Sequence, residues 1–321
     1  MNFVWPFQYF LIIGFVLFAF VQIYLRLAVK YNLFDTPNER SSHTKRTIRG
    51  GGVIFLITII GYLFISKGQY FTVLAGALAL GVISFVDDVK NLPAKLRLAL
   101  HFIVVIFLLY DLDLLHFTWL LPVLMVFILW LMNAYNFMDG INGITFSNTL
   151  SHLFALVYAA YLTGFIDLNL LYLLILTNLV FGYYNFRKQA ICFLGDVGSI
   201  PLGFVLIALT LLLVIDNGSI DPLVFFSLYM IDSGWTIVQR ILNRENILKP
   251  HRKHLYQLLA NEYKIGHLEI STGFFMIQMV INTGYFILDD RIEDNGYFFL
   301  VMAISSLVYI PLKYFLVKRA N

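Results

Sequence analysis

Apolar residues run through this chain in long blocks that are separated by short polar segments. A helix needs about 20 mostly apolar residues to cross a lipid bilayer, and most of the blocks approach that length. The pattern therefore predicts an all-α, polytopic membrane protein in which residues 1–321 form one transmembrane domain. The expected spans are residues 5–28, 51–66, 70–86, 98–111, 117–133, 145–163, 168–186, 199–215, 222–240, 268–288 and 297–316.

Composition supports this class of protein. Hydrophobic residues make up 60% of the chain and charged residues 13%, whereas soluble domains are about half apolar and a quarter charged. The segment 1–10 lacks the basic start and cleavage site of a signal peptide, so we expect the first span to be retained. The single cysteine, Cys192, excludes an intrachain disulfide and a cysteine-based zinc site.

The charged residues predict an orientation in the membrane. With eleven spans, 20 of the 22 lysines and arginines fall on one side, and only Lys67 and Arg291 fall on the other. Loops rich in lysine and arginine remain in the cytoplasm. We therefore expect a bacterial inner-membrane protein with its N-terminus outside and its C-terminus and active site on the cytoplasmic side.

The polar stretch from Asn133 to Gly143 follows an apolar span and holds an unusual density of amide and carboxylate groups. A helix cap and its turn would explain one asparagine and one glycine. They would not explain Asn133, Asn136 and Asp139, whose spacing of three continues one face of a helix. Gly140 and Gly143 permit positive φ and close approach of a ligand. This stretch therefore predicts a binding site.

Two other segments on the basic side are candidate binding sites, one for an anion and one for a cation. Arg49 precedes three glycines at a helix start, where exposed N–H groups and the helix dipole favour an anion. Asp87 and Asp88 close a span, and each carboxylate there opposes the helix dipole by roughly 0.3–1 kcal/mol. They need a compensating cation, which is Lys90, Lys95, Arg97 or a metal.

The loop around Asp196 offers a ligand for a hard cation. Asp196 is flanked by glycines and precedes a helix, so it serves either as an N-cap or as a Mg²⁺ ligand. Phe193 either stacks on a nucleobase or anchors the chain at the bilayer surface.

The segment with His251, Arg252 and His254 lacks a third nearby zinc ligand and fits a pyrophosphate clamp better. Asp232 lies inside an expected span, and such an acid is functional or paired by default, with Ser233 and Arg240 as candidate neighbours.

Taken together, these motifs resemble the polyprenyl-phosphate N-acetylhexosamine-1-phosphate transferase family, in the bacterial branch that begins O-antigen and related glycans. The resemblance covers residues 40–257. It is carried in order by Arg49-Gly-Gly-Gly, Asp87-Asp88, Asn133-x-x-Asn136-x-x-Asp139-Gly140-x-Asn142-Gly143, Phe193-Leu-Gly-Asp196-x-Gly-Ser199 and Pro250-His251-Arg-x-His254-Leu-Tyr. The last motif departs from the three-histidine form of the peptidoglycan-precursor branch, which argues against a muramyl-pentapeptide substrate.

The resemblance implies ten or eleven helices around a cytoplasm-facing cleft, a homodimer and no nucleic-acid partner. It implies transfer of sugar 1-phosphate from a UDP-N-acetylhexosamine to undecaprenyl phosphate, with release of UMP and with Mg²⁺ or Mn²⁺ as cofactor. Asp196, with Asn136, would bind the metal, and Asp87 or Asp88 would act in acid–base chemistry. Lys95 would be a third catalytic residue, holding the diphosphate. The implied substrate-binding residues are Arg49, Asn133, Asp139, Gly140, Asn142, Phe193, His251, Arg252 and His254.

Two mechanisms and one rival function stay open at this point. We favour direct attack of the lipid phosphate, because its second pKa near 6 leaves it largely ionised at pH 7 without a general base. The alternative mechanism passes through an aspartyl-phosphate. The rival function is a secondary transporter, which would place its polar groups near the bilayer midplane and would often show repeated halves.

Overall fold

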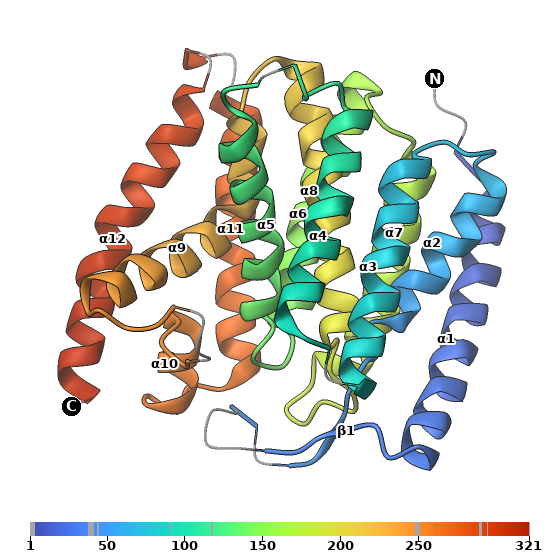
Figure 1. Ribbon diagram of the computed structural model, residues 1–321, viewed down its shortest axis with the longest axis horizontal. Coiled ribbons are helices and arrows are strands. Elements are labelled where there is room, and N and C mark those ends of the chain that lie inside the picture. The colour runs from blue at the N-terminus through green and yellow to red at the C-terminus, as the bar shows by residue number, and fades with distance from the viewer. Residues whose placement is uncertain are drawn as a thin grey trace.

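The computed structural model describes residues 4–37, 42–43, 45–90, 92–116, 118–247, 251–288, 291–293 and 295–320. Pro250, part of the histidine motif, lies outside them. The described chain is a bundle of helices whose two ends lie at opposite ends of the bundle (Figure 1). Its helices are α1 (Phe7–Lys30), α2 (Val53–Ile65), α3 (Phe71–Lys90), α4 (Ala94–Asp111), α5 (Leu121–Phe137), α6 (Ile144–Thr163), α7 (Leu168–Asn185), α8 (Asp196–Asn217), the 3₁₀ helix η1 (Asp221–Phe226), α9 (Ser227–Leu242), α10 (Leu255–Asn261), α11 (His267–Leu288) and α12 (Gly296–Ala320).

The all-α membrane architecture is confirmed. By length and apolar composition, α1, α3, α7, α8, α11 and α12 each qualify to cross a bilayer among the described residues, and α2 and α5 are shorter apolar helices. The outermost helices α1 and α12 bury few of their residues, and large apolar side chains such as Phe15 and Leu307 are exposed on them. Exposed apolar side chains of this kind are favourable in contact with lipid but not in contact with water.

Helix α8 forms the centre of the bundle. It packs against α3, α5 and α6, and buried apolar residues cover nearly its whole circumference. A helix that is apolar all round is stable only when it is enclosed on every side. Because α8 begins at Asp196, this packing fixes the position of that carboxylate.

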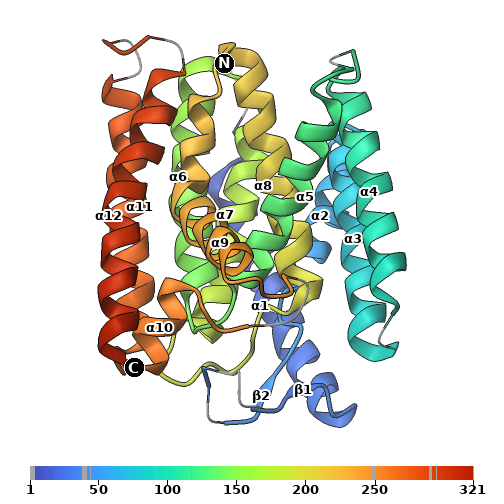
Figure 2. The same ribbon diagram turned by 60° about the vertical axis from the view of Figure 1, so that its left-hand side comes forward.

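One expected span differs in shape. The range 222–240 is helical, but it changes from the 3₁₀ helix η1 to the α-helix α9 after Phe226. Figures 1 and 2 show α9 lying obliquely to its neighbours, viewed from the side in the first and nearly along its axis in the second. Helix α9 carries buried polar and charged residues, including Asp232 and Arg240, and it directs the following loop toward α10.

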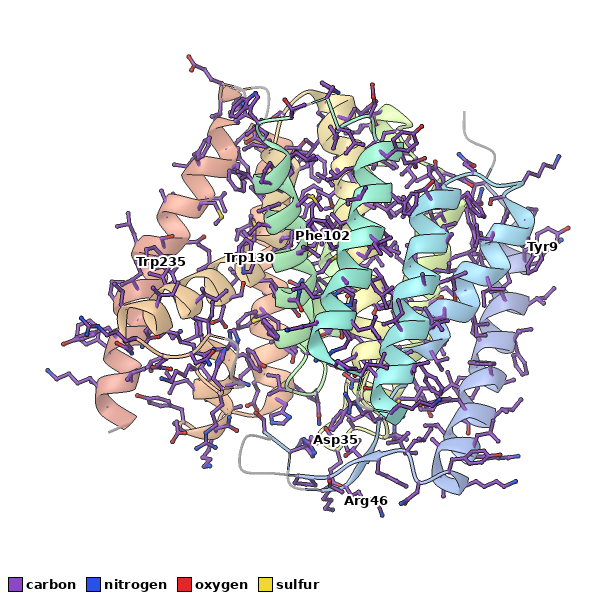
Figure 3. All side chains as sticks on the ribbon, viewed as in Figure 1. Tyr9, Asp35, Arg46, Phe102, Trp130 and Trp235 are labelled. Atoms are coloured by element: carbon purple, nitrogen blue, oxygen red, sulfur yellow. The ribbon has the colours of Figure 1, made fainter. Side chains whose placement is uncertain are left out.

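The loops opposite the N-terminus carry the small amount of β-structure. Strands β1 (Phe34–Asp35) and β2 (Thr47–Ile48) pair antiparallel, and Ile48 also bridges to Cys192. In Figure 3, Asp35 and Arg46 lie at this end of the bundle, far from Tyr9 on α1. The first loop is thereby held against the loop that precedes α8.

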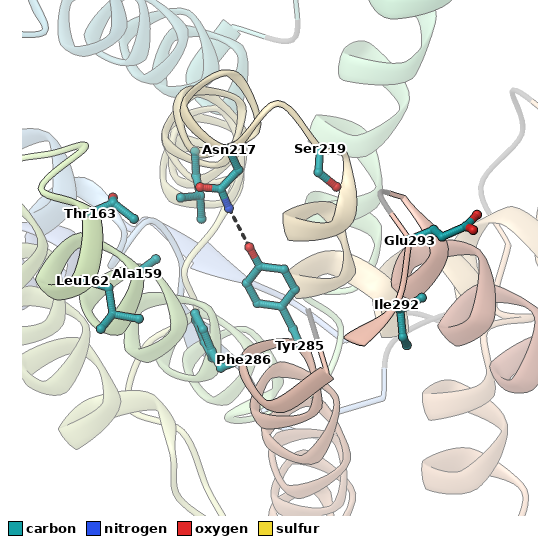
Figure 4. A pocket seen from close by; sticks show the side chains of 10 residues that line it. Ala159, Leu162, Thr163, Asn217, Ser219, Tyr285, Phe286, Ile292 and Glu293 are labelled. Atoms are coloured by element: carbon teal, nitrogen blue, oxygen red, sulfur yellow. Dashed lines mark hydrogen bonds between the residues drawn. The ribbon is translucent and has the colours of Figure 1, made fainter. Parts of the chain in front are cut away.

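A cavity of about 840 Å³ lies near the other end of α8, around Asn217 and Tyr285 (Figure 4). The Asn217 amide donates a 2.7 Å hydrogen bond to the Tyr285 hydroxyl there. Its described lining includes one carboxylate, Glu293, and no lysine or arginine. The described lining of this cavity therefore lacks the cations that a phosphate substrate requires.

Candidate active site

Backbone pairing brings the first loop onto the loop before α8. The Phe193 N–H donates to the Ile48 carbonyl at 2.8 Å, and the Gly51 N–H donates back to the Phe193 carbonyl at 2.8 Å. The Gly52 N–H donates to the Leu194 carbonyl at 2.9 Å. A Cβ atom on Gly52 would lie 2.3 Å from the Cα of Gly198, so only glycine fits this crossing.

This pairing corrects the expected use of the three glycines. The N–H groups of Gly51 and Gly52 are bonded to backbone carbonyls, so the prediction that they bind an anion is wrong. The glycines instead allow two loops to touch, which places Arg49 beside the start of α8.

Arg49 joins two acidic segments. Its Nη2 atom lies 2.7 Å from Asp88 Oδ1 and 3.4 Å from Asp196 Oδ1. Asp196 is the first residue of α8, the N-cap is Gly195, and that cap has no side-chain hydrogen bond. The N-cap alternative for Asp196 is therefore wrong, and its carboxylate faces the guanidinium.

Asp87 is held by partners of its own. Arg97 Nη1 lies 2.6 Å from Asp87 Oδ2, and the Leu92 N–H donates to Asp87 Oδ1 at 2.7 Å. Lys95, which the sequence analysis selected, is exposed in the first turn of α4. Of the candidate bases Lys90, Lys95 and Arg97, the structure thus places Arg97 on Asp87.

A cavity of about 260 Å³ opens at this cluster. Its lining comes from segments far apart in the sequence: Asp35, Ser42, His43, Arg49, Asn136, Asp139, Gly140, Ile141, Asn185, Phe193, Gly195, Asp196 and Gln257. The amide oxygen of Asn136 accepts a 3.0 Å hydrogen bond from the Ser199 hydroxyl, beside Asp196. Asn133 is not part of this lining, because its amide donates to the Leu129 carbonyl of its own helix at 2.7 Å.

The turn after α5 combines a desolvated acid with a crowded glycine. Burial, followed by the charge of Asp196, raises the pKa of Asp139 to about 7. Gly143 has a φ of 83°, as predicted, but the glycines with positive φ in the described chain do not include Gly140. A Cβ on Gly140 would lie 2.1 Å from the Tyr256 hydroxyl, so the space beside it holds a tyrosine and not a ligand.

Asn142 and Asn185 connect loops beneath the cavity. The Asn142 amide donates to the carbonyls of Arg187 and Lys188 at 2.9 and 3.2 Å. Asn185, which the sequence analysis did not select, accepts from the Gly143 N–H at 2.8 Å and donates to the Cys192 carbonyl at 3.0 Å. In the sequence Asn185 looks like an ordinary helix cap, because it is an asparagine at the end of a helix. Nothing in the sequence therefore distinguished it as a site residue.

Phe193 and His43 form an aromatic wall of the cavity. Their ring centroids are 4.8 Å apart with an interplanar angle of 63°. His43 Nε2 lies 3.9 Å from Asp35 Oδ2, yet burial lowers the pKa of His43. The wall is therefore uncharged near neutral pH, which suits stacking of a neutral nucleobase.

The histidine segment belongs to a neighbouring cluster. His254 Nδ1 lies 3.4 Å from Asp232 Oδ1, and Arg252 forms an ion pair with Glu262 at 3.6 Å. Burial, together with the charges around it, lowers the pKa of His251 to about 4, so this imidazole is neutral at pH 7. Of this region, Gln257 reaches the cavity lining, and the sequence analysis missed it.

The structure gives Asp232 a partner beyond the predicted Ser233 and Arg240. The Ser233 hydroxyl donates to the Tyr229 carbonyl at 2.6 Å, and the Arg240 guanidinium donates to the Ile247 carbonyl at 3.1 Å. The Tyr309 hydroxyl, from α12, donates to Asp232 at 2.7 Å.

The donor atoms around Arg49 fit a magnesium ion. Asp88, Asp196 and the amide of Asn136 present oxygen atoms, which are the ligands that Mg²⁺ takes. Among the described residues, no group of three or more histidines, cysteines and acids has the arrangement of a complete metal site. Mg²⁺ usually takes one or two carboxylates and completes its shell with water and substrate phosphates.

Residues 70–214 match the model of glycosyl transferase family 4, and this range runs from α3 through most of α8, including Asp196. Over this range the chain is similar to glycosyl transferase family 4. The chain is 27% identical over 259 residues to a probable undecaprenyl-phosphate N-acetylglucosaminyl 1-phosphate transferase of Bacillus subtilis, covering 73% of this chain and 71% of that protein. It is also 28% identical over 223 residues to a phospho-N-acetylmuramoyl-pentapeptide-transferase of Streptococcus pneumoniae, covering 61% of this chain and 68% of that protein.

Proposed function

We propose that this protein transfers N-acetylhexosamine 1-phosphate from a UDP-N-acetylhexosamine to undecaprenyl phosphate and releases UMP. The observation that carries the proposal is the contact of Arg49 with both Asp88 and Asp196 at a cavity walled by Phe193. This arrangement combines an oxygen-rich cation site, a guanidinium and an aromatic ring, which are the groups that a nucleoside diphosphate and a metal need. The name of the Bacillus subtilis relative supports the same reaction class.

The cavity suggests how the donor nucleotide is held. Phe193 offers a face to the uracil ring, and the half-protonated carboxyl of Asp139 offers a hydrogen-bond donor to a uracil carbonyl near pH 7. Asn142 and Asn185 hold the loops that form the floor of this pocket. In this proposal the diphosphate lies toward Arg49, because that residue supplies the nearest positive charge.

The reaction exchanges one phosphoanhydride bond for another. An oxygen of the lipid phosphate attacks the phosphorus that carries the sugar, and a new P–O–P bond forms. The old bond from that phosphorus to the bridging oxygen breaks, and the bridging oxygen leaves with UMP. A bound Mg²⁺ would neutralise charge on the diphosphate and the leaving phosphate. Arg49 and Arg97 stabilise the crowded anions, and such electrostatic effects dominate phosphoryl transfer.

The contacts of Asp87 favour direct attack over an aspartyl-phosphate through this residue. Both of its carboxylate oxygens already accept hydrogen bonds, from Arg97 and from the Leu92 N–H. These two donors stabilise the negative charge on Asp87 and so lower its nucleophilicity. Radiolabelled protein trapped after incubation with labelled UDP-sugar, without lipid, would contradict direct attack.

We also propose that the site faces the cytoplasm of a bacterium, with the N-terminus outside. The cavity lies at the basic end of the bundle. Loops rich in lysine and arginine remain on the cytoplasmic side of the membrane, so this end faces the cytoplasm in our proposal. The lipid tail remains in the bilayer while its phosphate meets a soluble nucleotide at the surface, where positive charge attracts both anions. Formation of the lipid-linked sugar would begin O-antigen or a related glycan, and we propose a homodimer as the assembly.

The test is direct. Purified protein in detergent is incubated with undecaprenyl phosphate, Mg²⁺ and each of a panel of UDP-N-acetylhexosamines, and UMP is measured. We expect UMP from at least one UDP-N-acetylhexosamine and dependence on the lipid. If only UDP-N-acetylmuramoyl-pentapeptide yields UMP, the protein acts in peptidoglycan synthesis instead. If no donor yields UMP, the proposal that the protein is this enzyme is wrong.

A further inference from the structure

A buried carboxylate outside the cavity receives hydrogen bonds from three parts of the chain. Asp232, in α9, is 2% exposed. The Tyr309 hydroxyl donates to its Oδ1 atom at 2.7 Å, and the Leu255 N–H lies 3.0 Å from each carboxylate oxygen. The Thr236 hydroxyl adds a third donor at 3.3 Å. A buried carboxylate is stable only with such donors, so its position depends on all of them.

Helix α12 supplies the cation of this cluster. Lys313 is 6% exposed, and its Nζ atom donates to the Thr236 hydroxyl at 2.6 Å. Nζ also lies 5.2 Å from the ring centroid of Tyr309. Tyr309 and Lys313 are four residues apart and therefore share one face of α12, the face turned to α9. Helices α9 and α12 pack against each other, and Figure 1 shows α9 reaching α12.

Asp232 in turn holds the start of α10. Leu255 is the first residue of that helix, and its N-cap His254 lies 3.4 Å from Asp232. The Gln257 side chain accepts from the His254 N–H at 3.3 Å and also lines the cavity. The Tyr256 hydroxyl donates to the Phe137 carbonyl at 2.7 Å, just before the Asp139 turn. Contacts thus run from α12 through Asp232 and α10 to the cavity.

We propose that Tyr309 and Lys313 are positioning residues for the transfer reaction. They hold Asp232 in place, and Asp232 holds the His254–Gln257 segment and the turn at Asp139 against the donor pocket. The proposal rests on the function proposed above, and it assigns to the last helix of the chain a role in the reaction that no motif in its own sequence indicates.

The kinetic test compares two variants on the inner face of α12 with two on its exposed face. Tyr309→Phe and Lys313→Met should each lower kcat/KM for the UDP-sugar about 10-fold, the usual effect of losing one hydrogen bond to a charged group. The loss should fall on the KM of the UDP-sugar and leave the KM of undecaprenyl phosphate unchanged. Tyr314→Phe and Lys318→Met, at exposed positions, are matched controls that should retain activity. Lys313→Arg should recover most of the loss.

A double-mutant cycle identifies the route. If Tyr309 acts through the His254 segment, Tyr309→Phe should have little further effect in a His254→Ala background, since coupled residues are not additive. Full additivity of the two losses would overturn the proposal.

A spectroscopic test is independent of turnover. A nitroxide on Lys253→Cys reports the motion of the segment, and Cys192 is too buried to be labelled. Its spectrum should show greater mobility in Tyr309→Phe and Lys313→Met, and no change in Tyr314→Phe. Lost activity with an unchanged spectrum would overturn the proposal. If the unmodified protein releases no UMP from any donor, the proposed function fails, and the spectra alone decide whether α12 holds the segment.

Discussion

Arg49 Nη2 lies 2.7 Å from Asp88 Oδ1, and this contact joins the first loop to the end of α3. The same guanidinium lies 3.4 Å from Asp196 at the start of α8. One positive charge between two carboxylates leaves a net negative charge, which favours a divalent cation at the same place. The contact thus accounts for the proximity of two acids that would otherwise repel each other.

The first prediction concerns this guanidinium. Arg49→Met should lower kcat/KM for UMP release by about 100-fold, because removal of one group that stabilises transition-state charge commonly costs 10²–10³-fold. The measurement is UMP release at saturating lipid. Arg46→Met is the matched control, since Arg46 bonds to Asn32 and lies outside the cavity lining, and it should retain most of the activity. Equal losses in both variants would contradict the proposed role of Arg49.

The second prediction concerns the two acids of α8. Asp196→Asn should reduce turnover by about 100-fold or more and should raise the Mg²⁺ concentration needed for half-maximal activity, because the amide loses the charge that holds a cation. Asp216→Asn, at the exposed far end of the same helix, should leave both quantities unchanged. Full turnover by Asp196→Asn would remove Asp196 from the metal site.

The third prediction concerns the crossing of the loops. Gly52→Ala places a methyl group 2.3 Å from the Gly198 Cα, and backbone must move to accept it. We expect a loss of about 3 kcal/mol or more in the free energy of unfolding, at the upper end of overpacking costs. Gly61→Ala, in α2, meets nothing within 4 Å and should be neutral or stabilising by about 0.5–1 kcal/mol. The measurement is thermal denaturation in detergent, and similar midpoints for the two variants would contradict the close contact.

The fourth prediction concerns pH. Burial raises the pKa of Asp139 from 3.8 to about 7 in the folded protein. Well below pH 3.8 the carboxyl is protonated in both the folded and unfolded states. Between pH 4 and 7 only the unfolded state ionises, so stability falls as pH rises, by up to about 1.4 kcal/mol per pH unit.

Asp139→Asn removes this titration. The difference in stability between Asp139→Asn and the unmodified protein should therefore grow in favour of the variant from pH 4 to 7 and become constant above pH 8. Parallel stability curves over the same range would show that Asp139 is ionised in the folded protein.

Sequence reasoning located the helices well because membrane insertion depends on local properties. The predicted range 168–186 corresponds to α7, Leu168–Asn185, and the predicted range 268–288 to α11, His267–Leu288. The sequence left a choice open where a side chain's partner depends on how two helices pack. Lys95 and Arg97 are equally plausible cations by position, and only the packing of α3 beside α4 selects Arg97 for Asp87.

The histidine segment shows the same limit. Its motif indicated substrate binding, but the geometry ties His254 to Asp232 and, through it, to Tyr309, which is 55 residues further along the chain. Tyr309 belongs to an apolar helix with no distinguishing motif, so the sequence alone offered no reason to single it out.

By itself, the sequence determined the membrane architecture, the basic side of the protein and the motifs that carry the family resemblance, because hydrophobic length, loop charge and motif spacing are read within one segment at a time. Only the tertiary structure decided that Gly51 and Gly52 pair with the Phe193 loop, that Arg49 bridges Asp88 and Asp196, and that α12 supports α10. These relationships depend on which surfaces meet when the helices pack, and that is settled by shape and buried polar pairing between distant segments.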